Sequence, residues 1–292
     1  MKRTMWTGLI GLLCLAMATS LGSAKAMMIA PQPISQRVAN AEVIVVGKVT
    51  GFGDRTVSAT PAPGAKDKVE YQIAIVKVES TIAGTKGTKE IKVGFIPPAA
   101  GGAAPGGPIR PGIRRPMGVN FTLDMEALMF LTKHHDGDFY VAPMYFSVVS
   151  KGGNTNFEKD VDETKRCVKL LADPKSGLES KEMGDRVLTA GMLMSKFRQY
   201  KPGKPVQKPI DADLSKKILL TLAEADWQAR PARPGPFQMN PQMIFGQLQL
   251  TEKDGWKVPK DYKEFPAKAK EWCKENAEKY VIKRIVYESE KK

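Results

Sequence analysis

The sequence predicts an α+β protein in which a small five-stranded β-barrel is followed by a mostly helical domain. Runs of β-branched residues at 41–50 and 69–80 have the density of buried strands. After Gly152 the spacing of apolar residues changes from two to 3.6, which is the period of a helix. A proline- and glycine-rich stretch at 97–119 is suited to a long loop between strands. The two parts should therefore meet near residue 150.

Five strands are expected in the first part, after a polar, extended lead-in at 27–40. The run at 43–49 is apolar on both faces at its start, which predicts a buried strand. The run at 69–80 changes phase near Ile75 and Val76, and one extra residue there would form a β-bulge that bends the strand. Five short strands with one overlong loop favour a closed barrel over an open sandwich. The other strands are expected at 89–95, 123–132 and 139–149.

Helical periodicity dominates the second part, and apolar stripes predict its elements in turn. Asp211 or Asp213 is suited to cap one helix, and Asn240 with Pro241 forms a cap followed by proline at the first helical position. The segment 201–210 is interpreted as a linker. Helices are expected at 161–171, 183–197, 214–225, 240–250 and 266–280, with a terminal strand at 281–288.

The first 26 residues have the three-part pattern of a secretory signal peptide. Lys2 and Arg3 precede an apolar run, and Ala24 and Ala26 form an A-x-A cleavage site. The mature chain is then expected to begin at Met27, in the periplasm or secreted, with an uncleaved membrane anchor as the alternative. The expected organisation is a signal peptide at 1–26, a barrel at 27–150 with its loop at 97–119, and a helical domain at 151–292.

The chain is strongly basic, with a net charge of +14. Removing the leader takes away three basic residues and leaves 42 against 31 acidic ones, a net of +11. Such an excess can attract anionic polymers, lipid head groups or acidic proteins, or can serve solubility alone. Arg110, Arg114 and Arg115 stand in the 97–119 loop, and their guanidinium groups match phosphate, sulfate and carboxylate. We interpret them as a candidate anion-binding site, the alternative being a solvated loop without a ligand.

The expected mature chain keeps two cysteines, Cys167 and Cys273. Export would permit a disulfide between them, and closing a loop of roughly 100 residues stabilises by up to about 4.7 kcal/mol in the chain-entropy treatment. Both cysteines lie within helical patterns, where a buried free thiol packs as a small apolar residue. The sequence leaves both possibilities open. There is no Cys-x-x-Cys motif, so neither a redox motif nor a thiolate zinc site is expected.

No catalytic residue, metal site or cofactor is expected. His134 and His135 are the only histidines, and adjacent side chains on extended backbone point to opposite faces, so we interpret both as turn residues. Serine-hydrolase, phosphate-loop and dinucleotide motifs are missing. Carboxylate pairs such as Asp160 with Asp162 lie at helix starts, and an envelope hydrolase would need such pairs to converge in a cleft. Aromatic residues do not interleave with the basic ones, so specific nucleic-acid binding is not expected.

Three segments of the first part resemble the netrin-like or tissue-inhibitor-of-metalloproteinase-like group of OB-folds. They read AEVIVVGKV, YQIAIVKVESTIAG and IKVGF, and the Gly-Lys-Val at 47–49, Tyr71 and the Ala-Gly at 83–84 stand where that group has them. The resemblance implies an OB-like barrel over about residues 35–149. Inhibitors of that group place an amino-terminal cysteine on the enzyme's zinc, whereas this chain has no cysteine between Cys14 and Cys167. Zinc-directed inhibition is therefore not expected.

These features predict an exported, non-catalytic binding or adaptor protein of the cell envelope that recognises a protein partner through barrel loops. The alternative is electrostatic binding of an anionic polymer or a membrane surface through the basic loop.

Overall fold

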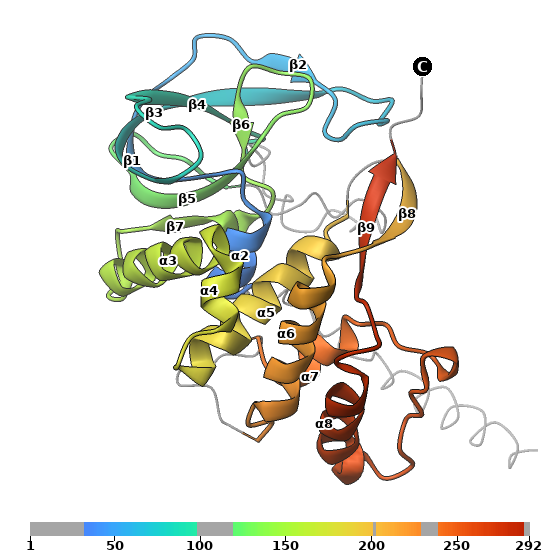
Figure 1. The fold of residues 1–292 in the computed structure, drawn as a ribbon. Helices are drawn as coiled ribbons and strands as arrows, with labels where there is room; N and C mark the ends of the chain where they lie inside the picture. The colour runs from blue at the N-terminus through green and yellow to red at the C-terminus, as the bar shows by residue number, and fades with distance from the viewer. Residues whose placement is uncertain (1–31, 98–118, 201–202, 229–238, 289–292) are drawn as a thin grey trace, which may run out of the picture. The chain divides into compact units, whose positions relative to one another are not determined.

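The structure is a computed structural model, and it describes residues 32–97, 119–200, 203–228 and 239–288. The predicted signal peptide and most of the predicted loop at 97–119 lie outside these ranges. The described part has mixed α+β architecture, with a seven-stranded sheet, a two-stranded sheet and seven α-helices (Figure 1). The chain after Ala30 forms one compact unit. The predicted α+β class is confirmed.

Five strands of the large sheet close into a ring. Going round it, β1 (Val43–Phe52) pairs with β3 (Val69–Ala83), then come β4 (Glu90–Phe95), β6 (Tyr140–Val141) and β5 (Glu126–Lys133), which pairs again with β1. The β4–β6 pairing is parallel and the other pairings of the ring are antiparallel. The short strands β2 (Val57–Ala59) and β7 (Val148–Ser150) pair with β3 and β5 outside the ring.

Alternate side chains of β1 enter two different cores, as its apolar character on both faces predicts. Val45 and Val49 are fully buried inside the ring with residues of β3, β4 and β5. Ile44 points the other way and packs against helices in a second hydrophobic cluster. A strand buried on both sides needs no polar face, which explains the density of β-branched residues from Val43 onward.

The predicted bulge exists, but its extra residue lies on the partner strand. Val49 of β1 pairs with Val76, and Gly51 pairs with Ile75, so Thr50 is the inserted residue. The pairing of β3 with β4 runs through this region without a shift. The phase change of β3 has another cause. On one face of the strand Tyr71 packs in a small outer cluster, and on the other face Val76 packs inside the ring. Both faces of the strand are covered, each over a different length.

The prediction of a single strand at 139–149 is wrong. This segment is divided into β6, a 3₁₀ turn at Tyr145–Ser147, and β7. Both strands use the same edge of β5, with β6 at Thr132–Lys133 and β7 at Ala127–Met129. Pro143 lies between them and has no N–H to donate, so the chain leaves the sheet there and returns further along β5.

The lead-in to β1 is helical rather than extended as expected. Residues Ile34–Asn40 form α2, which begins directly after Pro33. Its Val38 and Ala39 are buried in the same cluster as Ile44 and Phe130 of the ring. Tertiary burial therefore outweighs the local preference of a proline-containing segment.

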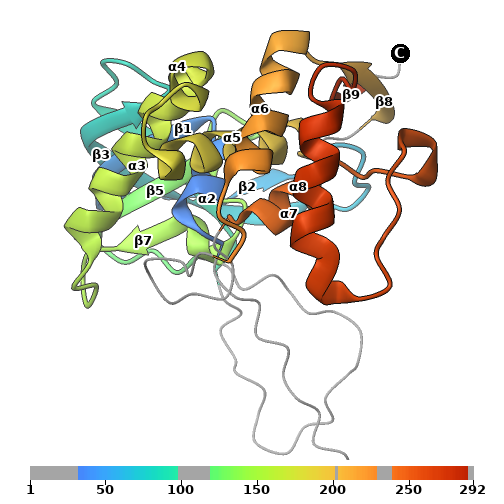
Figure 2. The same cartoon turned by 60° about the horizontal axis from the view of Figure 1, so that its bottom comes forward.

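The helices continue this cluster away from the ring. Phe157 and Cys167 of α3 and Met192 of α5 contribute to it, so strands and helices share one apolar core. A larger cluster, which includes Trp272, holds α5, α6, α7 and α8 together. Figure 2 shows these four helices grouped on one side of the cartoon. Two predicted caps are confirmed, because Asp211 accepts from the Leu214 N–H and Asn240 accepts from the Met243 N–H. The helices span Phe157–Ala172 (α3), Pro174–Leu178 (α4), Met183–Phe197 (α5), Ala212–Glu224 (α6), Pro241–Gly246 (α7) and Phe265–Asn276 (α8).

The segment interpreted as a linker is a strand. Residues Lys204–Pro209 form β8, which pairs with the terminal strand β9 (Lys283–Glu288) in a separate two-stranded ribbon. The predicted strand at the carboxyl end is thereby confirmed. Two prolines, Pro205 and Pro209, stand within β8, and their positions determine which edge of this ribbon is open.

Candidate interaction surface

A tight turn stands at the rim of the five-stranded ring, where the chain enters β5. The Met125 N–H donates to the Thr122 carbonyl at 3.2 Å, and the Asp124 N–H donates to Val49 of β1 at 2.9 Å. Asp124 has a φ of 63°, in the left-handed region that few residues other than glycine adopt. This turn holds Leu123 outward with 59% of its surface exposed. The strand expected from residue 123 thus begins only at Glu126.

The turn forms one wall of a shallow groove of about 470 Å³, which we call the rim groove. The segment after β7 forms the opposite wall, because Lys151 donates its N–H to the Glu126 carbonyl and keeps the two segments side by side. An exposed leucine beside an open groove on a fixed backbone is available for burial by a partner. The rim groove is lined by Thr122, Leu123, Asp124, Met125, Glu126, Ser150, Lys151 and Gly152.

Two ion pairs border the rim groove. Lys48 lies 2.8 Å from Asp124, and Lys151 lies 2.8 Å from Glu126. These hydrogen-bonded partners raise the pKa of both lysines and lower the pKa of Glu126. All four groups are at least partly exposed to solvent, so the pairs add little to stability. Their effect is to place charges of both signs around an apolar centre, which is suited to a protein partner rather than to a simple anion.

The two histidines lie close together, contrary to the expectation that their rings point apart. β5 ends at Lys133, so the backbone is no longer extended and the two ring centroids are 4.5 Å apart. His134 is buried and stacks on Phe139 at 4.5 Å, and its Nδ1 accepts from the Asp136 N–H at 3.1 Å. Burial lowers the pKa of His134, and the neighbouring His135 lowers it further.

Cys167 and Cys273 are free, buried thiols in the structure. Cys167 lies in the cluster shared by ring and helices, and Cys273 lies in the separate helical core. Burial raises the pKa of each thiol to about 12, so neither is a nucleophile at neutral pH.

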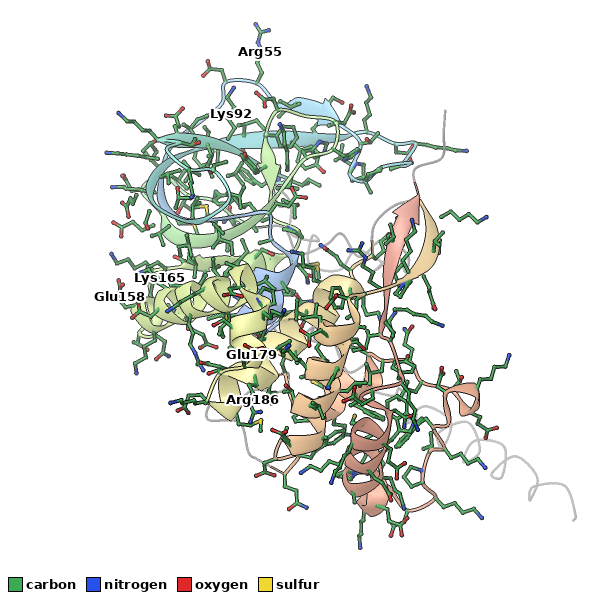
Figure 3. The ribbon with its side chains drawn as sticks, viewed as in Figure 1. Arg55, Lys92, Glu158, Lys165, Glu179 and Arg186 are labelled. Carbon is green, nitrogen blue, oxygen red and sulfur yellow. The ribbon has the colours of Figure 1, made fainter. Side chains whose placement is uncertain are left out.

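The predicted anion-binding residues Arg110, Arg114 and Arg115 lie outside the described residues. The described ranges carry 34 basic and 30 acidic side chains, a net of +4, so most of the net charge of +14 belongs to the remaining segments. Exposed charges of the described part are mixed, with Lys165 and Glu158 both on α3 (Figure 3). No broad basic face is therefore expected on this part.

Within the described ranges, no three His, Cys, Asp or Glu side chains gather in a group that could hold a metal ion. None of the described helices has the length and apolar character needed to cross a membrane. No family model matches the chain, and a comparison with curated proteins found no match.

The rim groove was not predicted from sequence. The apolar run that follows Leu123 and Asp124 is continuous, so the sequence predicts a strand that includes both. Asp124 is the one local signal, because aspartate is enriched in turns and in left-handed backbone. The hydrogen bonds to β1 that set this turn join residues about 75 positions apart, and no local pattern reveals them.

Proposed function

We propose that this protein is an exported, non-catalytic binding or adaptor protein of the cell envelope, and that it recognises a protein partner through the rim groove. The observation that carries the proposal is Leu123, an apolar side chain held outward by a left-handed turn beside an open groove. A partner could bury this side chain at the centre of an interface. The ion pairs around it supply the polar rim that protein interfaces have.

We also propose that the ring is an OB-like barrel. The order of the ring strands supports this. Counted along the chain, the third ring strand (β4) pairs in parallel with the fifth (β6), and the fourth (β5) pairs with the first (β1) and closes the ring. Small barrels of this class bind ligands with the loops at their rims, which is where the groove lies. The predicted signal peptide at 1–26 supports a location in the envelope.

The test is site-specific photo-crosslinking in envelope extract. A photoreactive phenylalanine analogue replaces Leu123 in one protein and Val258 in another; Val258 is an apolar residue that is 73% exposed and lies outside the groove. We expect a discrete crosslinked protein from position 123 alone, and it should persist when binding is done at about 0.5 M salt, where screening is strong. Equal crosslinking from both positions, or none from position 123, would contradict the proposal.

Electrostatic binding of an anionic polymer or a membrane surface is the second candidate. One observation favours it: the excess positive charge resides largely in segments such as 98–118, which contain Arg110, Arg114 and Arg115. Replacing these three arginines with alanine should weaken binding to anionic vesicles and flatten its salt dependence, while leaving crosslinking at position 123 unchanged. Vesicle binding that is unaffected by the substitutions would remove this candidate.

A further inference from the structure

The β8–β9 ribbon has one closed and one open edge. Ile210 N–H donates to the Ile282 carbonyl at 2.9 Å, in line with the register that pairs Lys208 with Arg284. Hydrogen-bonded pairs alternate along an antiparallel ladder, so the backbone N–H and C=O groups of Lys208 and Arg284 hydrogen-bond to each other. The residues between the bonded positions direct their N–H and C=O groups away from the partner strand. On β8 these residues are Pro205, Gln207 and Pro209; on β9 they are Lys283, Ile285 and Tyr287.

Proline protects the edge of β8. Two of its three outward positions have no N–H, so another strand could not form a regular ladder there. The outward positions of β9 all keep their N–H groups, and no described residue hydrogen-bonds to them or adds a third strand. An edge that is blocked on one side and left open on the other is suited to accept a strand at a single place.

The side chains around this open edge are mostly basic. Arg284 is paired with Lys208 on one face of the ribbon, Lys204 stands further along the same face in register with Glu288, and Lys283 stands on the other face. All four are exposed, and Glu288 is the only acid of the two strands. Acidic side chains on an added strand would be attracted to these exposed cations. The partner suited to this edge is therefore acidic.

We propose that β9 binds an extended acidic peptide segment as a third strand of the ribbon, a site independent of the rim groove. Main-chain hydrogen bonds from Lys283, Ile285 and Tyr287 would supply affinity, and Arg284 would select acidic side chains. A second copy of this chain is disfavoured as the occupant, because pairing two β9 edges would bring the lysines and arginines of two ribbons together.

The experiment uses the full chain and a fluorescein-labelled eight-residue peptide of alternating Glu and Val, with binding followed by fluorescence anisotropy. Ile285→Pro removes the central outward N–H at a position equivalent to those where β8 already has proline, so the ladder to β8 is kept. We expect it to weaken binding at least about tenfold, whereas Ile285→Ala, which keeps the N–H, should have a much smaller effect. Arg284→Gln should lower affinity and flatten its salt dependence; Lys279→Gln, an equal change of charge outside the ribbon, should not.

A second measurement does not depend on how the variant folds. The same peptide N-methylated at alternate residues cannot pair along its edge, and it should bind at least about tenfold more weakly to the unaltered protein. Three results would overturn the proposal. Equal binding of the methylated and plain peptides would indicate charge attraction alone. No binding of either peptide would leave the edge without this ligand. Dimerisation in ultracentrifugation that Ile285→Pro abolishes would make a second copy the occupant.

Discussion

His134 makes the fold sensitive to pH through a single buried ring. Its Nδ1 accepts the Asp136 N–H, so the neutral tautomer fits and a proton on Nδ1 would break that bond. Its buried Nε2 makes no hydrogen bond of normal geometry with a described group. Burial and the neighbouring His135 lower the pKa of His134 by more than the Thr60 backbone and Asp136 raise it. Phe139 and Tyr71 surround the ring, and a side chain at Gly94 would collide with Phe139, so the pocket has little room to adjust.

This geometry predicts a loss of stability in mild acid. Because the folded-state pKa of His134 is lowered, the unfolded chain binds the proton more readily below its ordinary pKa of about 6.5. Stability should therefore be fully present above that pH and fall as the pH decreases toward the folded-state pKa. Urea unfolding at pH 7.5 and 5.5 should show this fall, and His134→Phe, which keeps the stacking, should reduce it. The matched control is His135→Phe on the exposed neighbour, and an equal fall in all three proteins would show that His134 is not responsible.

At the scale of elements, helix caps show what local chemistry contributes. The Asp211 carboxylate accepts the Leu214 N–H at 2.9 Å at the start of α6. The N-cap residue of α3, Asn156, makes no such bond with its side chain. Similar residues at similar positions thus differ in whether they satisfy a free N–H of the first turn.

The two caps should differ in measured stability. Asp211→Ala should lower the free energy of unfolding by about 1 kcal/mol, because the Leu214 N–H loses its acceptor. Asn156→Ala should have an effect near zero, and chemical denaturation of both variants at pH 7 tests the difference. Equal losses would mean that the Asp211 bond contributes nothing specific to α6.

The ends of the strands depend on which neighbouring strands they pair with, whereas the helix caps depend on local sequence. The 139–149 segment has enough apolar and aromatic residues for one strand, yet β6 and β7 pair with different ends of β5. The prolines of β8 suggested a linker, yet they occupy the positions whose N–H groups would point out of the ladder. In both cases the deciding factor is which backbone group faces which neighbour.

At the scale of the whole molecule, one core joins the ring to the helices. Leu128 and Phe130 of β5 are almost completely buried and pack in the same cluster as Phe157 and Met192 from the helices. Alternate residues of β5, such as Met129, are buried inside the ring. A single strand is thus shared by two cores, and unfolding one of them should expose the other.

This sharing predicts that both halves unfold together. Leu128→Ala should cost about 2–5 kcal/mol, because a cavity would form between strand and helices. Apart from Trp6 in the predicted leader, the tryptophans are Trp227, Trp256 and Trp272, all in the helical half, so their fluorescence reports on that half. The fluorescence transition of the variant should move to lower urea by as much as the transition in circular dichroism. A fluorescence transition that stays in place would show that the halves unfold independently.

The sequence by itself determined the α+β class, the change from strands to helices near residue 150, and the caps at Asp211 and Asn240, because period and capping are local properties. Only the tertiary structure decided where Thr50 is inserted, that α2 is helical, and that Leu123 stands at a turn beside a groove. Each of these depends on contacts between segments far apart in the chain. The apolar run around β5 does not reveal which residues face the ring, which face the helices, and which stay exposed as Leu123 does.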